Sequence, residues 1–414
     1  MLFSTVPCPK PPGAKEAAAL GFTSSLGPFA VNTYLPGLHQ MAESFDVGFV
    51  AMEQSLTVYL VSFAVSSIVS GALSDALGRK STLTGGMLVF ALASLGAMWS
   101  SSLAALCFWR MLQGLGAGVG QVVTQAVVRD AWSGRNAARM NALIAMFFAV
   151  SPALAPVLGG WIISLLSWHA VFVFLAVYAL SIAVFVQFGM AETHPAHQRT
   201  VLHLRPLAAN YSLCLRSAAL TAGSAAHGFC FMGGILYTAG SADYVIKIMG
   251  LDMASFAWFS LPTVTASLIG SWLSGALLRR LGARRLVYGV TLVGVVVMAT
   301  TALVVWLYPA AGRWMILGPC LYWLLISTAR PVMMAMNLDY LPAQRGTAAA
   351  VQQFLVTFSF AVCAALWVPL VLGHAWKYAA VSALCLILTA LSWQISMRCR
   401  PRTLQQAGVS EQLL

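Results

Sequence analysis

Long apolar runs alternate with short polar segments along the whole chain. Each run is close to the roughly 20 residues that an α-helix needs to cross a bilayer. The pattern therefore predicts an all-α membrane protein with twelve transmembrane helices, at residues 17–38, 53–73, 81–99, 104–127, 140–163, 169–190, 217–238, 254–278, 286–308, 313–335, 348–372 and 376–397.

The overall composition agrees with this pattern. Of the 414 residues, 60% are hydrophobic and 8% are charged, whereas soluble proteins average about 45–50% and about 25%. So many apolar residues cannot be hidden in a water-soluble core. A soluble globule is excluded, and a multi-pass membrane protein is expected.

The net charge of +12 is concentrated on one side of the predicted helices. Eighteen of the 23 Lys and Arg residues fall on the side that holds both chain ends. Since cytoplasmic loops are enriched in Lys and Arg, we expect both termini in the cytoplasm and the chain in a bacterial inner membrane. The charge is then a topology signal, and no nucleic-acid partner is expected.

A polar segment and an internal repeat divide the chain into two halves. The expected organisation is a cytoplasmic N-terminal tail (1–16), a six-helix bundle (17–190), a cytoplasmic linker (191–216), a second six-helix bundle (217–397) and a cytoplasmic C-terminal tail (398–414). The sequence GALSDALGRK at 71–80 recurs as GALLRRLGAR at 275–284. Duplicated halves around a central cavity are typical of secondary transporters.

Four short motifs lie in the first half. They are Asn32-x-Tyr34-Leu35-Pro36, Gly71-x-x-x-Asp75-x-x-Gly78-Arg79-Lys80, Arg110-x-x-Gln113-Gly114-x-Gly116-Ala117 and Ser151-Pro152-x-x-x-Pro156-x-x-Gly159-Gly160. In these motifs the chain resembles the major facilitator superfamily, in particular its twelve-span drug:proton antiporter branch of the bicyclomycin/chloramphenicol-resistance type. The resemblance covers nearly the whole chain and implies two pseudo-symmetric bundles.

The loop motif at 71–80 is the first candidate functional element. The resemblance implies that Asp75 and the basic residues form a gating latch with neighbouring helix ends, which holds the outward-facing state. The residues of this latch are Gly71, Asp75, Gly78, Arg79 and Lys80. The alternative is a solvated turn that obeys the positive-inside rule. In the second copy Arg279 replaces the acid, so that latch is degenerate.

The fourth predicted helix carries a polar stripe. At 100° per residue, its members fall within about 120° of one another; they are Arg110, Gln113, Gln121, Thr124 and Gln125. A polar face is costly against lipid, so it should line the bundle interior or a water-filled cavity. Arg110 is expected to couple occupancy of the cavity to helix position, or else to cap neighbouring carbonyl groups.

The fifth predicted helix contains Pro152, Pro156, Gly159 and Gly160. Prolines and paired glycines bend a helix and free carbonyl groups inside the bundle. The resemblance implies that this segment marks export rather than uptake; the alternative is a packing kink.

The first predicted helix departs from the family pattern. Asn32 stands where the family has an Asp that helps to bind protons and cationic drugs. An amide cannot titrate, although it can form hydrogen bonds with a substrate, so Asn32 and Tyr34 are expected in the substrate cavity, with interhelical bonding of Asn32 as the alternative. The remaining candidates for proton binding are Glu53, Asp243 and His227.

Arg330 lies in the tenth predicted helix, at a position that the family usually makes apolar. It either extends toward the inner surface or faces the cavity. If Arg110 and Arg330 both faced the cavity, an anionic or zwitterionic substrate would fit better than a lipophilic cation.

These patterns together predict a secondary active transporter. Its expected role is export of a small drug-like or siderophore-like molecule by alternating access, with protons as the candidate coupling ion. The alternatives are a facilitator or uptake carrier for an anionic metabolite and a transport-inactive membrane sensor. No catalytic constellation occurs on one helix face, so no enzyme, cofactor or metal is expected, and the chain is expected to be a monomer in the lipid bilayer.

Overall fold

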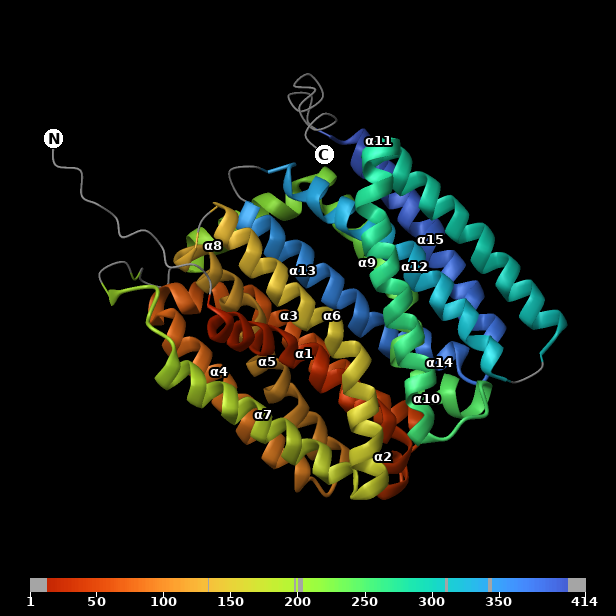
Figure 1. The fold of residues 1–414 in the computed structure, drawn as a ribbon, viewed down its shortest axis with the longest axis horizontal. Helices are drawn as coiled ribbons and strands as arrows, with labels where there is room; N and C mark the ends of the chain where they lie inside the picture. Colours follow the sequence, from red (N-terminus) through yellow and green to blue (C-terminus); the bar gives the residue numbers. More distant parts are fainter. Residues whose placement is uncertain are drawn as a thin grey trace.

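The computed structural model describes residues 13–400 except 133, 197, 198, 200–203, 310, 311 and 342–344. Most of the two tails expected at 1–16 and 398–414 therefore lies outside the described residues. Within the described residues the chain is helical, without strands. Figure 1 shows long helices that run roughly parallel and antiparallel to one another across the molecule.

The first half contains six long helices and a short one. They are α1 (Ala14–Tyr34), followed by the 3-10 turn η1 (Leu35–Gly37), α2 (Leu38–Ser44), α3 (Phe49–Leu77), α4 (Arg79–Met98), α5 (Leu103–Ala131), α6 (Gly134–Leu165) and α7 (Trp168–Gly189). The polar linker is not a loop throughout, because its last part forms α8 (Leu204–Arg216).

The second half repeats this order. It contains α9 (Ala218–Ala239), α10 (Ser241–Asp243), the π-helical turn η3 (Tyr244–Ile248), η4 (Met253–Phe256), α11 (Ala257–Leu307), η5 (Arg313–Ile316), α12 (Leu317–Leu338), α13 (Arg345–Val362), the π-helical turn η7 (Cys363–Trp367), α14 (Val368–Val371) and α15 (Ala375–Arg398). α11 is two helices that meet at a break at Gly282.

The described residues thus form twelve long helical segments, with α11 counted as two and α13, η7 and α14 as one. Eight of the described helices, α11 counted once, are long and apolar enough to cross a membrane. The expected all-α, twelve-span fold class is confirmed, and the helix ends agree with the apolar runs to within a few residues.

The repeated loop has the same backbone in both halves. Gly78 has φ 95° and ψ 154°, and Gly282, its equivalent in the second copy, has φ 71° and ψ 159°. A side chain would be strained at such positive φ values, which glycine tolerates. The repeat seen in the sequence therefore specifies one tight helix-to-helix turn, used twice.

Glycines of α5 let three neighbouring helices approach its backbone. A Cβ at Gly118 would lie 2.8 Å from the carbonyl oxygen of Phe63 in α3, and one at Gly116 would lie 2.5 Å from that of Gly86 in α4. A Cβ at Gly120 would lie 3.0 Å from the carbonyl oxygen of Thr23 in α1. Small residues allow the close packing that stabilises helix pairs in lipid.

The two halves meet along two pairs of helices. α3 contacts α13 and η7, and α6 contacts α11 and η4. At one end of the molecule, called here the α2–α10 end, η1 also contacts α10. At the opposite end, called the linker end, α8 lies with the start of α1 and the end of α15 (Figure 1).

Gly116→Ala should destabilise the protein by about 1–3 kcal/mol, because the added methyl group collides with backbone and cannot be accommodated by a rotamer change. The measurement is the thermal unfolding midpoint of the purified protein in detergent. Gly85→Ala is the matched control, since Gly85 lies on the exposed face of α4 with open space at its Cβ position. Equal midpoints for the two variants would contradict the packing described for α5.

Candidate functional site: a cavity between the halves and two charge networks

A cavity of about 360 Å³ lies between α1 and α6 of the first half and α9, α11 and α12 of the second. Its wall is mostly apolar, with hydroxyl groups and a few larger polar side chains. The lining residues are Asn32, Pro152, Pro156, His227, Phe231, Thr238, Ser241, Phe256, Phe259, Ser260, Thr263, Val264, Ser267, Leu268, Ser271, Trp323, Ser327, Arg330, Pro331 and Met334. The second half supplies most of this wall.

Three predicted polar residues line this cavity: Asn32, His227 and Arg330. The Nδ2 group of Asn32 donates to the Pro28 carbonyl oxygen in its own helix at 2.7 Å. Its carboxamide oxygen is the remaining acceptor that a ligand can use. That Asn32 binds substrate stays a prediction.

Arg110 is held inside the first half instead. Its guanidinium group lies between the rings of Tyr34 and Tyr59, 4.4 and 4.2 Å from the ring centres. Its Nη1 donates to Gln113 at 3.0 Å, and Gln113 donates to Ser94 at 2.6 Å. This fully buried group joins α1, α3, α4 and α5, and the structure does not place Arg110, Tyr34 or Gln113 among the lining residues.

The other three residues of the polar stripe differ in burial. Thr124 is buried, Gln121 is half-buried and Gln125 is exposed. None of these three lines the described cavity. The stripe packs mainly within the first half, and a role for its members in substrate binding stays a prediction.

The side chain of Arg330, which belongs to α12, packs against the middle of α9. Its Nε donates to His227 Nε2 at 3.3 Å, and its guanidinium carbon lies 4.1 Å from the centre of the Phe231 ring. The side-chain amide of Gln352 in α13 lies 2.9 Å from the other ring nitrogen of His227. Because His227 and Phe231 are central in α9, the alternative in which Arg330 extends to the linker end is wrong.

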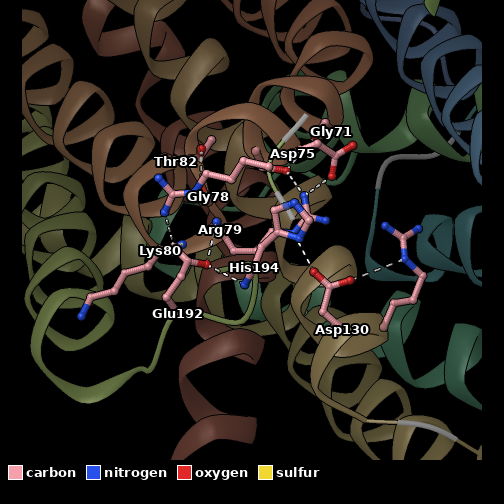
Figure 2. A network of polar contacts seen from close by, with 12 residues as sticks. Gly71, Asp75, Gly78, Arg79, Lys80, Thr82, Asp130, Glu192 and His194 are labelled. Atoms are coloured by element: carbon pink, nitrogen blue, oxygen red, sulfur yellow. Dashed lines mark hydrogen bonds and ion pairs between the residues drawn. The ribbon is translucent and has the colours of Figure 1, made fainter. Parts of the chain in front are cut away.

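The loop motif forms a charge network around Arg79 (Figure 2). The guanidinium group of Arg79 contacts Asp75 at 2.5 Å, Asp130 at 2.8 Å and the hydroxyl group of Ser74 at 2.6 Å. Arg79 is 3% exposed, so the alternative of a solvated turn does not describe this residue. Lys80, whose side chain points away from the network (Figure 2), fits that alternative better.

Glu192, just after α7, completes this network. Its carboxylate accepts from the backbone N–H groups of Arg79 and Lys80 at 3.0 and 3.3 Å and from that of His194 at 3.0 Å. A carboxylate at a helix N-terminus satisfies unpaired N–H groups and complements the helix dipole. Gly71, the first motif residue, has Val122 of α5 as the nearest neighbour of its Cβ position, at 3.8 Å.

Sequence reasoning missed Asp130 and Glu192 as partners of this motif. They stand 51 and 113 residues after Arg79, and motif spacing carries no information about such contacts. The one available signal was position, since both acids follow the ends of predicted spans on the same side as the motif. Asp75 reaches Arg79 within the first half, and its role as a latch between the halves stays a prediction.

The bending motif lies where α6 meets the cavity. Pro152 and Pro156 are inside α6 and line the cavity. A Cβ at Gly159 would collide with the Thr33 carbonyl oxygen of α1, and Gly160 is buried. The prolines thus face the space between the halves, whereas Gly159 lets α1 and α6 approach closely.

Acidic and basic side chains cluster at the α2–α10 end. Asp243 is buried, accepts from the Gly373 N–H group at 2.8 Å and pairs with Lys247 at 3.4 Å. Glu53 in α3 is 1% exposed, and neither of its oxygens has a hydrogen-bond partner among the described residues. Burial lowers the pKa of His39 in α2, and the charge of Lys247 lowers it further, against opposite effects of Asp243 and Glu43.

Among the described residues, no three His, Cys, Asp or Glu side chains come together in a way that suits a metal ion. The arrangement offers a ligand cavity with one guanidinium group, a charge network at the linker end and a buried carboxyl group at the α2–α10 end.

Comparison with known proteins identifies the family. The model of the Major Facilitator Superfamily matches residues 19–365. The chain therefore belongs to the major facilitator superfamily, as its motifs indicated.

Two curated relatives are similar in sequence. The bicyclomycin resistance protein homolog of Haemophilus influenzae is 29% identical over 64% of this chain and 66% of its own length. Multidrug resistance protein D of Escherichia coli (strain K12) is 31% identical over 57% of this chain and 62% of its own length. The resemblance to bicyclomycin-resistance proteins is confirmed, and the chain matches less than two thirds of the length of these relatives.

Solved structures share the fold at low sequence identity. A D-xylose–proton symporter has a TM-score of 0.70 and 13% identity over 91% of this chain and 96% of its own. A peptide transporter has a TM-score of 0.71 and 15% identity over 93% of this chain and 94% of its own. These likenesses concern the fold alone.

Asp130→Asn should destabilise the protein by about 1–3 kcal/mol, because it removes a charged partner of the buried Arg79. The thermal unfolding midpoint should therefore fall more in Asp130→Asn than in Asp75→Asn. The Asp130 side chain is 19% exposed and that of Asp75 is 42% exposed, so water replaces the lost contact more easily at Asp75. Lys80→Gln is the control and should change the midpoint little. A larger loss in Asp75→Asn than in Asp130→Asn would refute this order.

Proposed function

We propose that this protein is a secondary active transporter that exports a small organic molecule, drug-like or siderophore-like, from a bacterial cytoplasm. The single observation that carries this proposal is a cavity that lies between the two halves of a major facilitator fold. A site shared by two movable halves is the arrangement that alternating access requires. The names of the two relatives, which refer to resistance, support export as the direction.

The orientation follows from the side on which the basic residues lie. The linker end carries α8, the start of α1 and the end of α15 (Figure 1), and it is the side with most Lys and Arg. We place this end in the cytoplasm of a bacterial inner membrane and the α2–α10 end outside. The two halves contact each other at the α2–α10 end, so this conformation is closed toward the outside.

Protons are the proposed coupling ion, and Glu53 is the group that binds them. Glu53 of α3 is buried, without a hydrogen-bond partner among the described residues. It lies near Cys363 of η7, which belongs to the other half. A carboxylate in such a place is far more costly than the neutral acid. A proton on Glu53 therefore favours closure at this end, and its loss favours opening. The nearby Asp243 adds to this effect, because two negative charges would repel each other across the junction.

The uptake of an anionic metabolite is a second candidate, favoured by the unpaired Nη1 and Nη2 donors of Arg330 in the cavity. It predicts the same binding site and the opposite direction of net movement.

Everted membrane vesicles test direction and coupling together. With radiolabelled bicyclomycin and chloramphenicol as the first probes and a panel of organic acids as the second, an imposed gradient with an acidic interior should drive accumulation in vesicles that contain the protein. Glu53→Gln should remove this dependence on the gradient and lower accumulation by about tenfold, the effect of about 1.4 kcal/mol of lost coupling. Exchange without a gradient should persist.

Glu43→Gln, at an exposed acid of α2, is the matched control and should behave as the unmodified protein. Gradient-driven accumulation that survives in Glu53→Gln would exclude Glu53 as the coupling group. Absence of accumulation for every probe in the unmodified protein would overturn export itself.

A further inference from the structure

Arg330 is the one charged residue among the described residues that line the cavity, and no Asp or Glu faces it from that wall. His227, the other titratable lining residue, accepts from Arg330 through Nε2. Its imidazole ring is therefore neutral in this arrangement, since an accepting nitrogen carries no proton. The positive charge in the cavity belongs to Arg330 alone.

The contacts of Arg330 fix its orientation and leave its outer edge open. Nε is used by His227, and one face of the guanidinium plane lies on the Phe231 ring. The Nη1 and Nη2 groups have no hydrogen-bond or ion-pair partner among the described residues. These two groups form the fork that binds a carboxylate or phosphate oxygen pair.

The other two arginines inside the helix bundle lie away from the cavity. Arg79 has two carboxylates around it. Arg110 is enclosed by two tyrosine rings and Gln113, where no ligand can reach it, although its Nε and Nη2 have no hydrogen-bond partner among the described residues. Arg330 has one aromatic face and one neutral imidazole, and it borders empty space. A charge away from bulk water and without a counterion is costly, so a charged ligand that supplies the counterion gains from this site.

We propose that Arg330 is the anchor for an acidic group of the transported molecule, a carboxylate, sulfonate or phosphate. Nη1 and Nη2 donate to two oxygens of this group, while His227, held by Gln352, keeps the guanidinium plane in position. The apolar body of the molecule packs against the aromatic wall formed by Phe231, Phe259 and Trp323. This assignment rests on the proposed transport function and adds the substrate class to it.

Matched pairs of probes test the anchor without knowledge of the natural substrate. Binding to the purified protein in detergent is measured by calorimetry for benzoate, naphthalene-2-carboxylate and naphthalene-2-sulfonate, each beside its neutral carboxamide or sulfonamide. The acid should bind at least about tenfold more tightly than its amide, as expected for charge-assisted hydrogen bonds. Arg330→Gln should abolish this preference and leave amide binding unchanged.

Two further variants separate an anchor from a structural residue. Arg330→Lys keeps the charge but lacks the fork, and it should retain a weaker preference for acids. Arg313→Gln is the matched control, because Arg313 also lies over an aromatic ring, that of Trp258 at 4.7 Å, but outside the cavity. It should leave both members of each pair unaffected, and thermal unfolding of every variant reports on folding.

Two competition experiments distinguish a small-molecule acid from free phosphate or a lipid headgroup as the natural ligand of Arg330. Inorganic phosphate and phosphatidylglycerol are each added as competitors; a small-molecule site should keep its acid preference in their presence, whereas a phosphate or lipid site should lose it. Loss of the preference in either arm, its absence in the unmodified protein, or its survival in Arg330→Gln would overturn the anchor. Export of neutral or cationic probes would remain measurable in the vesicle assay, so failure of the anchor is distinct from failure of the proposed function.

Discussion

A charge that leaves water needs groups that compensate for the lost hydration, and the architecture depends on which groups surround three arginines: Arg79, Arg110 and Arg330. Arg79 has carboxylates from α3 and α5. Arg110 has the rings of Tyr34 and Tyr59 and an amide chain through Gln113. Each arrangement joins several helices, because no single helix can satisfy a guanidinium group whose five N–H donors point in different directions.

The kind of partner that each arginine has follows its position. Arg79 and Arg110 lie within one half, where the partners can stay fixed during any movement of the halves. Arg330 borders the space between the halves, where a permanent carboxylate partner would occupy the place of a ligand. The same logic applies to Glu53 at the α2–α10 end, whose unpartnered carboxyl group is compatible with closure as the neutral acid.

The sequence was sufficient for the fold but only partly for the site. Helix positions follow from apolar runs because lipid demands about 20 apolar residues per span, and the repeated loop marked both Gly78 and Gly282. The helical periodicity of the polar stripe in α5 indicated that Arg110 and Gln113 face the bundle interior. It could not indicate which side chains they contact, since that depends on how the helices pack. Glu192 was missed because its contact with Arg79 joins segments 113 residues apart.

The central claim is alternating access: the two halves close against each other at the α2–α10 end while the linker end is open, and the reverse. Spin-label distances in liposomes measure this directly, with one pair at Glu43 and Trp376 and another at Arg139 and Arg280 in a cysteine-free background; all four positions are exposed. At about pH 5.5 the first pair should be closer and the second farther apart than at about pH 8, because a neutral Glu53 favours closure at its own end. Distances that stay constant, or that change in the same direction at both ends, would contradict alternating access in this protein.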